Sequence, residues 1–102
     1  MKLKKGSVLY ARIDSRVKMK AAMPQDAMDS MAYIQNLAKE RFLLAGIFGD
    51  MQARNIDNAM VIYEAKDLAE AKKLAEDDPI IERGFYKTQV YEWNLMILSN
   101  DN

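Results

Sequence analysis

Two residue types that often carry catalytic or metal-binding chemistry are absent from this chain. It contains no histidine and no cysteine, which excludes a Ser-His-Asp triad, histidine-bound zinc, imidazole acid/base catalysis and thiolate chemistry. The remaining reactive or ligand-binding groups are carboxylates, amines, guanidinium groups and hydroxyls. Arg12 and Tyr10 stand two residues apart, so on a strand they share one face, where the arginine could bind an anionic group beside an aromatic wall. A cross-strand ion pair is the alternative role for Arg12.

Four aspartates could bind a metal ion, but their spacing does not favour a metal site. Asp50, Asp57, Asp77 and Asp78 do not follow the pattern of an EF-hand loop, and a hairpin loop better explains Asp50 and Asp57. An oxygen-only magnesium site stays open as an alternative. With four glycines, the chain also lacks a glycine-rich phosphate loop. We therefore expect neither a metal nor a cofactor.

Six segments are predicted to position these groups. Four stretches rich in apolar, β-branched or aromatic residues lie between turn signals and predict strands: Ser7–Ile13, Phe42–Phe48, Ala59–Glu64 and Phe85–Trp93. Two stretches with apolar residues at helical spacing predict helices, the first over Gln25–Arg41 and the second from just after Asp67 to about Asp77.

Each predicted helix carries its own signals. In the first, the apolar residues that recur at helical spacing and should face the core are Ala27, Met31, Ile34 and Ala38. In the second, Asp67 as N-cap and Glu70 three residues later form the pattern of a capping box. Pro79 keeps Asp78 out of helical geometry, so we expect this helix to stop before the Asp-Pro pair.

The order of these segments is β-α-β-β-α-β, which predicts an α+β, ferredoxin-like fold. Right-handed crossovers place the first and third strands in the middle of an antiparallel sheet, with both helices on one face. The central strands carry apolar side chains toward both faces, so two helices leave one apolar face uncovered. An exposed apolar patch of roughly several hundred Å2 is unusual for a soluble monomer. We therefore predict a homodimer in which two sheets pack face to face.

Composition and charge indicate the number of domains, the excluded partners and the expected location of the protein. The 102 residues predict a single domain, with a core at about 7–94 and a polar C-terminal tail at 99–102. Fifteen basic and fifteen acidic side chains give a formal net charge of zero, which argues against nucleic acid or an anionic membrane as a partner. No apolar run is long enough for a transmembrane helix. Together with the lack of cysteine, this leads us to expect a cytoplasmic protein that binds neither nucleic acid nor membranes.

Two segments resemble the YCII-related (YciI-like) family. Residues 32–37 (AYIQNL), followed by residues 42–46 (FLLAG), are similar to its AYL-type helix segment and its LLLAG strand. Residues 70–80 (EAKKLAEDDPI), followed by residues 84–86 (GFY), resemble its second signature, a helix that ends in Asp-Pro before a glycine and the last strand. The resemblance covers roughly residues 8–93 and implies a dimeric α+β barrel of ferredoxin-like subunits.

The resemblance also implies a cleft in which a histidine of the first helix and the aspartate of Asp-Pro form an acid/base pair. Asp78 matches the aspartate, whereas Ser30 stands where the family has its histidine, and a serine hydroxyl does not buffer protons near pH 7. Asp78 is thus the candidate catalytic residue, and Ser30, Arg12 and Tyr10 are candidate ligand contacts. Asp78 could instead be a turn residue whose carboxylate bonds the local backbone.

Two functional hypotheses follow. In the first, the chain is a YCII-like protein that binds a small organic acid or an aromatic ligand in a cleft near Asp78, and any catalysis is proton transfer of the lyase or isomerase type. In the second, the cleft has no function of its own, and the chain is a non-catalytic dimerisation or accessory module. The replacement of the family's histidine by Ser30 leaves open whether the chain is an enzyme.

Overall fold

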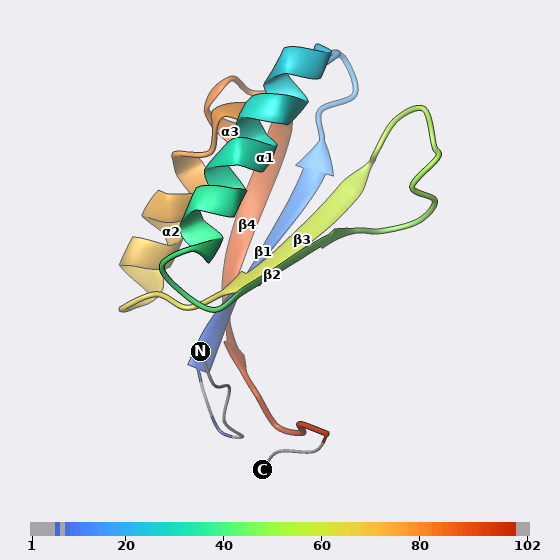
Figure 1. Ribbon diagram of the computed structural model, residues 1–102. Coiled ribbons are helices and arrows are strands. Elements are labelled where there is room, and N and C mark those ends of the chain that lie inside the picture. The colour runs from blue at the N-terminus through green and yellow to red at the C-terminus, as the bar shows by residue number, and fades with distance from the viewer. Residues whose placement is uncertain (1–5, 7, 100–102) are drawn as a thin grey trace.

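The computed structural model describes Gly6 and residues 8–99 of the chain (Figure 1). The strands in this part are β1 (Val8–Arg16), β2 (Leu43–Ile47), β3 (Asn58–Tyr63) and β4 (Tyr86–Asn94). The helices are α1 (Pro24–Ala38), α2 (Leu68–Glu76) and α3 (Pro79–Glu82). None of these described helices is long and apolar enough to cross a membrane.

All six predicted segments are present, and their ends differ from the predicted ones by at most three residues. The sequence patterns do not predict the short helix α3, which follows α2 almost at once. The predicted first strand begins at Ser7, and the predicted polar tail extends to residue 102. Ser7 and residues 100–102 lie outside the described residues.

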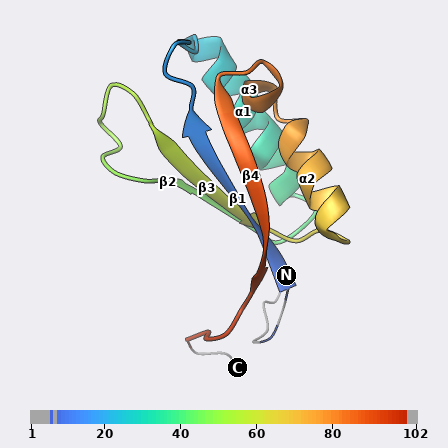
Figure 2. The same ribbon diagram turned by 180° about the vertical axis from the view of Figure 1, so that it is seen from behind.

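The sheet confirms the predicted α+β topology. Its strand order is β2-β3-β1-β4 and all neighbours are antiparallel, so β1 and β3 form the centre. The three helices lie against one face of the sheet, and the view from behind shows the other face without a helix (Figures 1 and 2). Within β1, Arg12 lies opposite Val61 of β3 and Val90 of β4. Arg12 therefore occupies the middle of the sheet.

Side-chain bonds to the backbone define where the later helices begin. The carboxylate of Asp67 accepts the N–H of Glu70 (2.8 Å) and caps α2 as predicted. The Glu70 carboxylate accepts the N–H of Lys66 (2.8 Å), one residue earlier than a reciprocal capping box requires. Asp78 caps α3, because its Oδ1 accepts the N–H of Ile80 (3.1 Å) and a proline occupies the first helical position. The Asp-Pro pair thus separates α2 from α3.

Helix α1 turns a different face to the sheet than its apolar periodicity predicts. Met28 and Met31 are 64% and 59% exposed, whereas Ser30 is buried and Tyr33 is half-buried. The Ser30 hydroxyl donates to the carboxylate that caps α3, and the Tyr33 hydroxyl donates to a carbonyl oxygen near the end of α2 (2.7 Å). Buried polar groups need such partners, and both bonds require this rotation of the helix. The prediction that Ala27, Met31 and Ala38 face the core is therefore wrong, since all three are exposed. It is confirmed for Ile34, which packs against the core.

The hydrophobic core lies between the sheet and the helices, chiefly under α2. Its buried residues are Tyr10, Val61, Tyr63 and Ala71, and the half-buried side chains packed against them are Ile34, Leu43, Ala65, Leu68, Leu74 and Val90. The Tyr63 hydroxyl crosses from β3 to α2 and donates to the carbonyl oxygen of Ala71 (2.5 Å). Burial raises the pKa of Tyr63 to about 12. The core thus holds α2 on the centre of the sheet by apolar packing and one buried hydrogen bond.

The sheet face opposite the helices, here called the open face, is apolar. Leu44, Tyr91 and Trp93 on this face are 57%, 50% and 40% exposed. Beside them, residues of β2 and β3 line a shallow and largely apolar hollow of about 190 Å3. The apolar residues that the sequence places on both faces of the central strands therefore have helices to cover them on one face only (Figure 2).

The buried hydroxyl of Tyr63 predicts a loss of stability at alkaline pH. The folded protein holds this proton up to about pH 12, whereas the unfolded chain releases it near pH 10, so stability falls as the pH rises above 10. In urea unfolding at about pH 9 and about pH 11, the native protein should lose about 1 kcal/mol more than Tyr63→Phe, which has no proton to release. Equal losses of unfolding free energy in the two proteins would contradict the raised pKa of Tyr63.

Candidate functional site

The candidate site begins with a buried arginine at the centre of the sheet. Arg12 is 2% exposed and lies on the helix-covered face of β1, two residues before Asp14. Its Nε lies 2.9 and 3.1 Å from the two carboxylate oxygens of Asp14, and its Nη2 lies 2.8 Å from Oδ2. Nη2 also lies 2.8 Å from Oδ2 of Asp78. Arg12 is therefore paired with its own strand and with the start of α3, and not with a neighbouring strand.

Asp78 uses its two carboxylate oxygens for different bonds. Oδ1 caps α3 by accepting the N–H of Ile80. Oδ2 accepts the hydroxyl of Ser30 (3.0 Å) and pairs with Arg12. The side chain is completely buried. The backbone bond that the sequence allows for an Asp-Pro pair is thus present, and it leaves the second oxygen to join α1 and β1.

Arg12, Asp14, Ser30 and Asp78 together form what we call the polar cluster. Burial by itself lowers the pKa of Arg12, but the hydrogen bonds and charges of the two aspartates outweigh it and raise that pKa overall. The guanidinium therefore stays charged. With both carboxylates ionised, the cluster carries one more negative than positive charge. Buried ion pairs are weak contributors to stability compared with apolar side chains of the same size, so stability alone does not explain this cluster.

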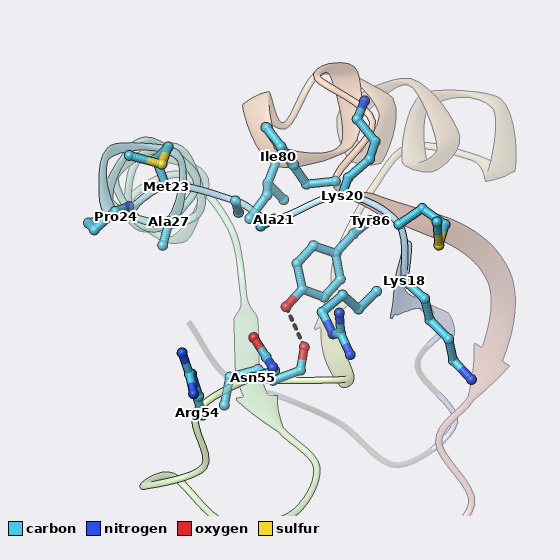
Figure 3. A pocket seen from close by; sticks show the side chains of 15 residues that line it. Lys18, Lys20, Ala21, Met23, Pro24, Ala27, Arg54, Asn55, Ile80 and Tyr86 are labelled. Carbon is cyan, nitrogen blue, oxygen red and sulfur yellow. Dashed lines mark hydrogen bonds between the residues drawn. The ribbon is translucent and has the colours of Figure 1, made fainter.

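Two adjoining cavities lie beside the polar cluster. The inner cavity, of about 140 Å3, is lined by Asp14 and Ser30 together with apolar side chains. The outer cavity, of about 460 Å3, lies between the β1–α1 loop, the β2–β3 loop, α3 and the start of β4 (Figure 3). Four residues line both cavities: Ala27, Ile56, Ile80 and Tyr86. Arg12 and Asp78 line neither, so Asp14 and Ser30 are the cluster residues within reach of a ligand.

The structure brings three of the four predicted site residues together. Asp78, Ser30 and Arg12 belong to the polar cluster, although they come from three separate elements. Tyr10 shares the face of Arg12 but packs in the hydrophobic core and lines neither cavity. Sequence reasoning missed Asp14 as a site residue. Alternation along the strand is the signal that could have found it, because Asp14 follows Arg12 by two residues just as Tyr10 precedes it.

The aspartates considered for a magnesium site have other partners. Asp50 accepts a backbone N–H within its own loop (2.8 Å), Asp57 pairs with Arg16 (2.9 Å), and Asp77 pairs with Lys73 (2.9 Å). Asp78 is bound within the polar cluster. In the part of the chain that the structure describes, no group of three or more potential ligand residues is arranged to hold a metal ion. The magnesium alternative therefore has no support from these residues.

The polar cluster predicts a large loss of stability when its cation is removed. Arg12→Leu leaves two buried carboxylates without a partner charge, and we expect the free energy of unfolding to fall by about 3–5 kcal/mol in urea titrations. Asp78→Asn, which leaves Arg12 paired with Asp14, should cost less.

Arg16→Leu is the matched control for Arg12→Leu. The side chains of Arg16 and its partner Asp57 are 24% and 70% exposed, and an ion pair so close to solvent contributes about 0–1 kcal/mol. Equal losses for Arg12→Leu and Arg16→Leu would contradict the view that the cluster is a buried, mutually dependent set of charges.

Comparisons with known proteins place the chain in a family. The sequence profile of the YCII-related domain matches residues 7–94. Among solved structures, the chain is similar to 5-chloro-2-hydroxyhydroquinone dehydrochlorinase (TftG) from Burkholderia phenoliruptrix AC1100 in complex with 2,5-dihydroxybenzoquinone. The TM-score is 0.62 at 18% sequence identity, over 83% of this chain and 92% of that chain. No curated protein matches the chain. The structural similarity shows a shared fold, and the profile match over most of its length shows that the chain belongs to the YCII-related domain family.

Proposed function

We propose that this protein binds a small organic acid or aromatic molecule in the inner and outer cavities. One observation carries the proposal: a buried polar cluster, joined internally by hydrogen bonds and ion pairs, presents only Asp14 and Ser30 to a cavity whose other walls are mostly apolar. Such pockets, with apolar walls and a few polar groups that orient the ligand, are typical of small-molecule sites. The similar fold of TftG, whose structure contains 2,5-dihydroxybenzoquinone, supports a ligand of this size and kind.

The same geometry is suited to proton transfer of the lyase or isomerase type. Asp14, in the wall of the inner cavity, can accept a proton from a ligand directly. Asp78 can accept one through Ser30: the ligand's proton goes to the serine oxygen while the serine hydroxyl proton passes to Asp78 Oδ2, 3.0 Å away. Arg12 keeps its charge and holds both carboxylates. In this proposal Ser30 touches the ligand, and Asp78 receives the proton without touching it.

A ligand screen tests the site. The purified protein is screened by thermal shift against small carboxylates, phenols and lactones. A ligand present at about 100 times its Kd adds about 2.7 kcal/mol to the free energy of unfolding and raises Tm by several degrees. Ser30→Ala and Asp14→Asn should remove most of this shift, because each takes away a polar group that lines the inner cavity.

Ser15→Ala is the matched control for the screen, since Ser15 is an exposed serine of β1 that lines neither cavity. It should bind the ligand as the native protein does. If Ser30→Ala and Asp14→Asn kept the full ligand-induced shift in Tm, the ligand would bind at another site. A screen without any hit would instead favour the accessory-module function.

We also propose that the protein is a homodimer whose two open faces pack against each other. Leu44, Tyr91 and Trp93 lie on this face together with the half-buried Met60 and Ile62. Burying exposed apolar surface contributes about 25 cal/mol per Å2, and a second copy offers the same apolar composition. A two-fold arrangement satisfies both copies at once.

Single charges on the open face should separate the dimer. Leu44→Glu places a carboxylate in the proposed interface, and the native mass of two chains should fall to one chain in light scattering at micromolar protein. Met28→Glu makes the same kind of change at an exposed methionine of α1 and should leave the dimer intact. A native protein with the mass of one chain would overturn the proposal.

A further inference from the structure

The outer cavity has an uneven charge. Its lining contains four basic side chains, Arg16, Lys18, Lys20 and Arg54, and no acidic one. The whole chain, by contrast, has equal numbers of basic and acidic residues. The outer cavity is therefore a positively charged opening in a molecule of zero formal net charge, and it attracts anions more than the rest of the surface does.

These four cations are not equally available to a ligand. Arg16 is paired through Nε with Asp57, and Lys20 donates to the carbonyl oxygen of Arg83 (3.1 Å). Within the described part of the chain, no ion pair joins Lys18 or Arg54 to a carboxylate. Figure 3 shows Arg54 across the hollow from Pro24 and Ala27, whereas Lys18 extends away on the far side of Tyr86. Arg54 is thus the cation best placed to meet a ligand.

The border between the two cavities is largely apolar. It consists of the four side chains that line both of them, those of Ala27, Ile56, Ile80 and Tyr86. The hydroxyl of Tyr86 donates its one proton to the carbonyl oxygen of Ile56, and this bond fixes the ring (Figure 3). A flat apolar body, such as an aromatic ring, packs against these side chains better than a polar chain does.

The inner cavity has the opposite electrostatic character. Asp14 and Ser30 line it, and the polar cluster behind them contains two carboxylates and one guanidinium. This cavity therefore repels an anionic group and favours one that donates a hydrogen bond, such as a hydroxyl. The outer cavity therefore favours an anionic group, and the inner cavity favours a group that donates a hydrogen bond.

We infer that the ligand is a hydroxylated aromatic acid, bound with its hydroxyl toward Asp14 and Ser30 and its carboxylate toward Arg54. This inference rests on the proposed function and adds the substrate class and the orientation to it. Arg54 is a ligand-binding residue that neither its spacing nor the family resemblance singles out. Because the outer cavity is open to solvent, the carboxylate contact weakens as the ionic strength rises.

Matched probes test the two ends separately. The affinities of 3- and 4-hydroxybenzoate, their neutral amides, and benzoate are measured by calorimetry at low and at physiological salt. The better hydroxybenzoate should bind roughly tenfold more tightly than its amide, which lacks the charge, and more tightly than benzoate, which lacks the hydroxyl. Its affinity should fall as salt increases, whereas that of the amide should not.

Two variants assign the carboxylate contact. Arg54→Gln should weaken hydroxybenzoate roughly tenfold and leave the neutral amide unchanged. Lys66→Gln removes the same charge from an exposed residue that lines neither cavity and should change neither affinity. Equal binding of acid and amide, or an Arg54→Gln variant with native affinity, overturns the inference.

The failure of this inference is distinguishable from failure of the proposed function. If other compounds in the screen bind in a Ser30-dependent way but neither hydroxybenzoate does, the substrate class is wrong and the site remains. If no compound binds, the proposed function and this inference fail together.

Discussion

The candidate site depends on one buried guanidinium held between two carboxylates. Arg12 of β1 binds Asp14 of its own strand and Asp78 at the start of α3, and Ser30 of α1 bonds to Asp78. Taking each charge out of water costs several kcal/mol, which only short and well-aligned bonds offset. The strand and the two helices must therefore keep one relative position. That position also directs Asp14 and Ser30 into the inner cavity.

Position along β1 sets the chemistry of the space between sheet and helices. Tyr10 lies in the hydrophobic core under α2 and lines neither cavity. Two residues on, Arg12 forms the ion pairs, and two further on, Asp14 reaches the inner cavity. The outer cavity continues in the same direction, toward the loops that precede α1 and β3 (Figure 3). Alternate residues of one strand thus lie in the hydrophobic core, in the ion pairs and in the wall of the inner cavity.

What could be predicted differs from residue to residue. Asp67 and the Asp-Pro pair act on their own backbone, so local signals locate both helix starts. The family resemblance places Ser30 and Asp78 in one site, and the structure joins them by a hydrogen bond. Apolar periodicity predicts that Met31 faces the core, because the pattern counts apolar side chains only. It contains no information on polar partners that lie on other elements. Asp14 escapes notice because an aspartate near a strand end is ordinarily a solvated residue.

The sequence by itself determined the order of strands and helices, the family, and the exclusion of histidine and thiolate chemistry. Periodicity, turn residues and composition suffice for these, because they are local or additive properties. Only the tertiary structure decided that Arg12 finds its second carboxylate in Asp78, and that Asp78 lies behind the cavity wall while Asp14 forms part of it. It also decided that Arg54, from the loop between β2 and β3, lines the outer cavity. The stability of a buried charge depends on every group around it, and chain folding brings those groups together from distant positions.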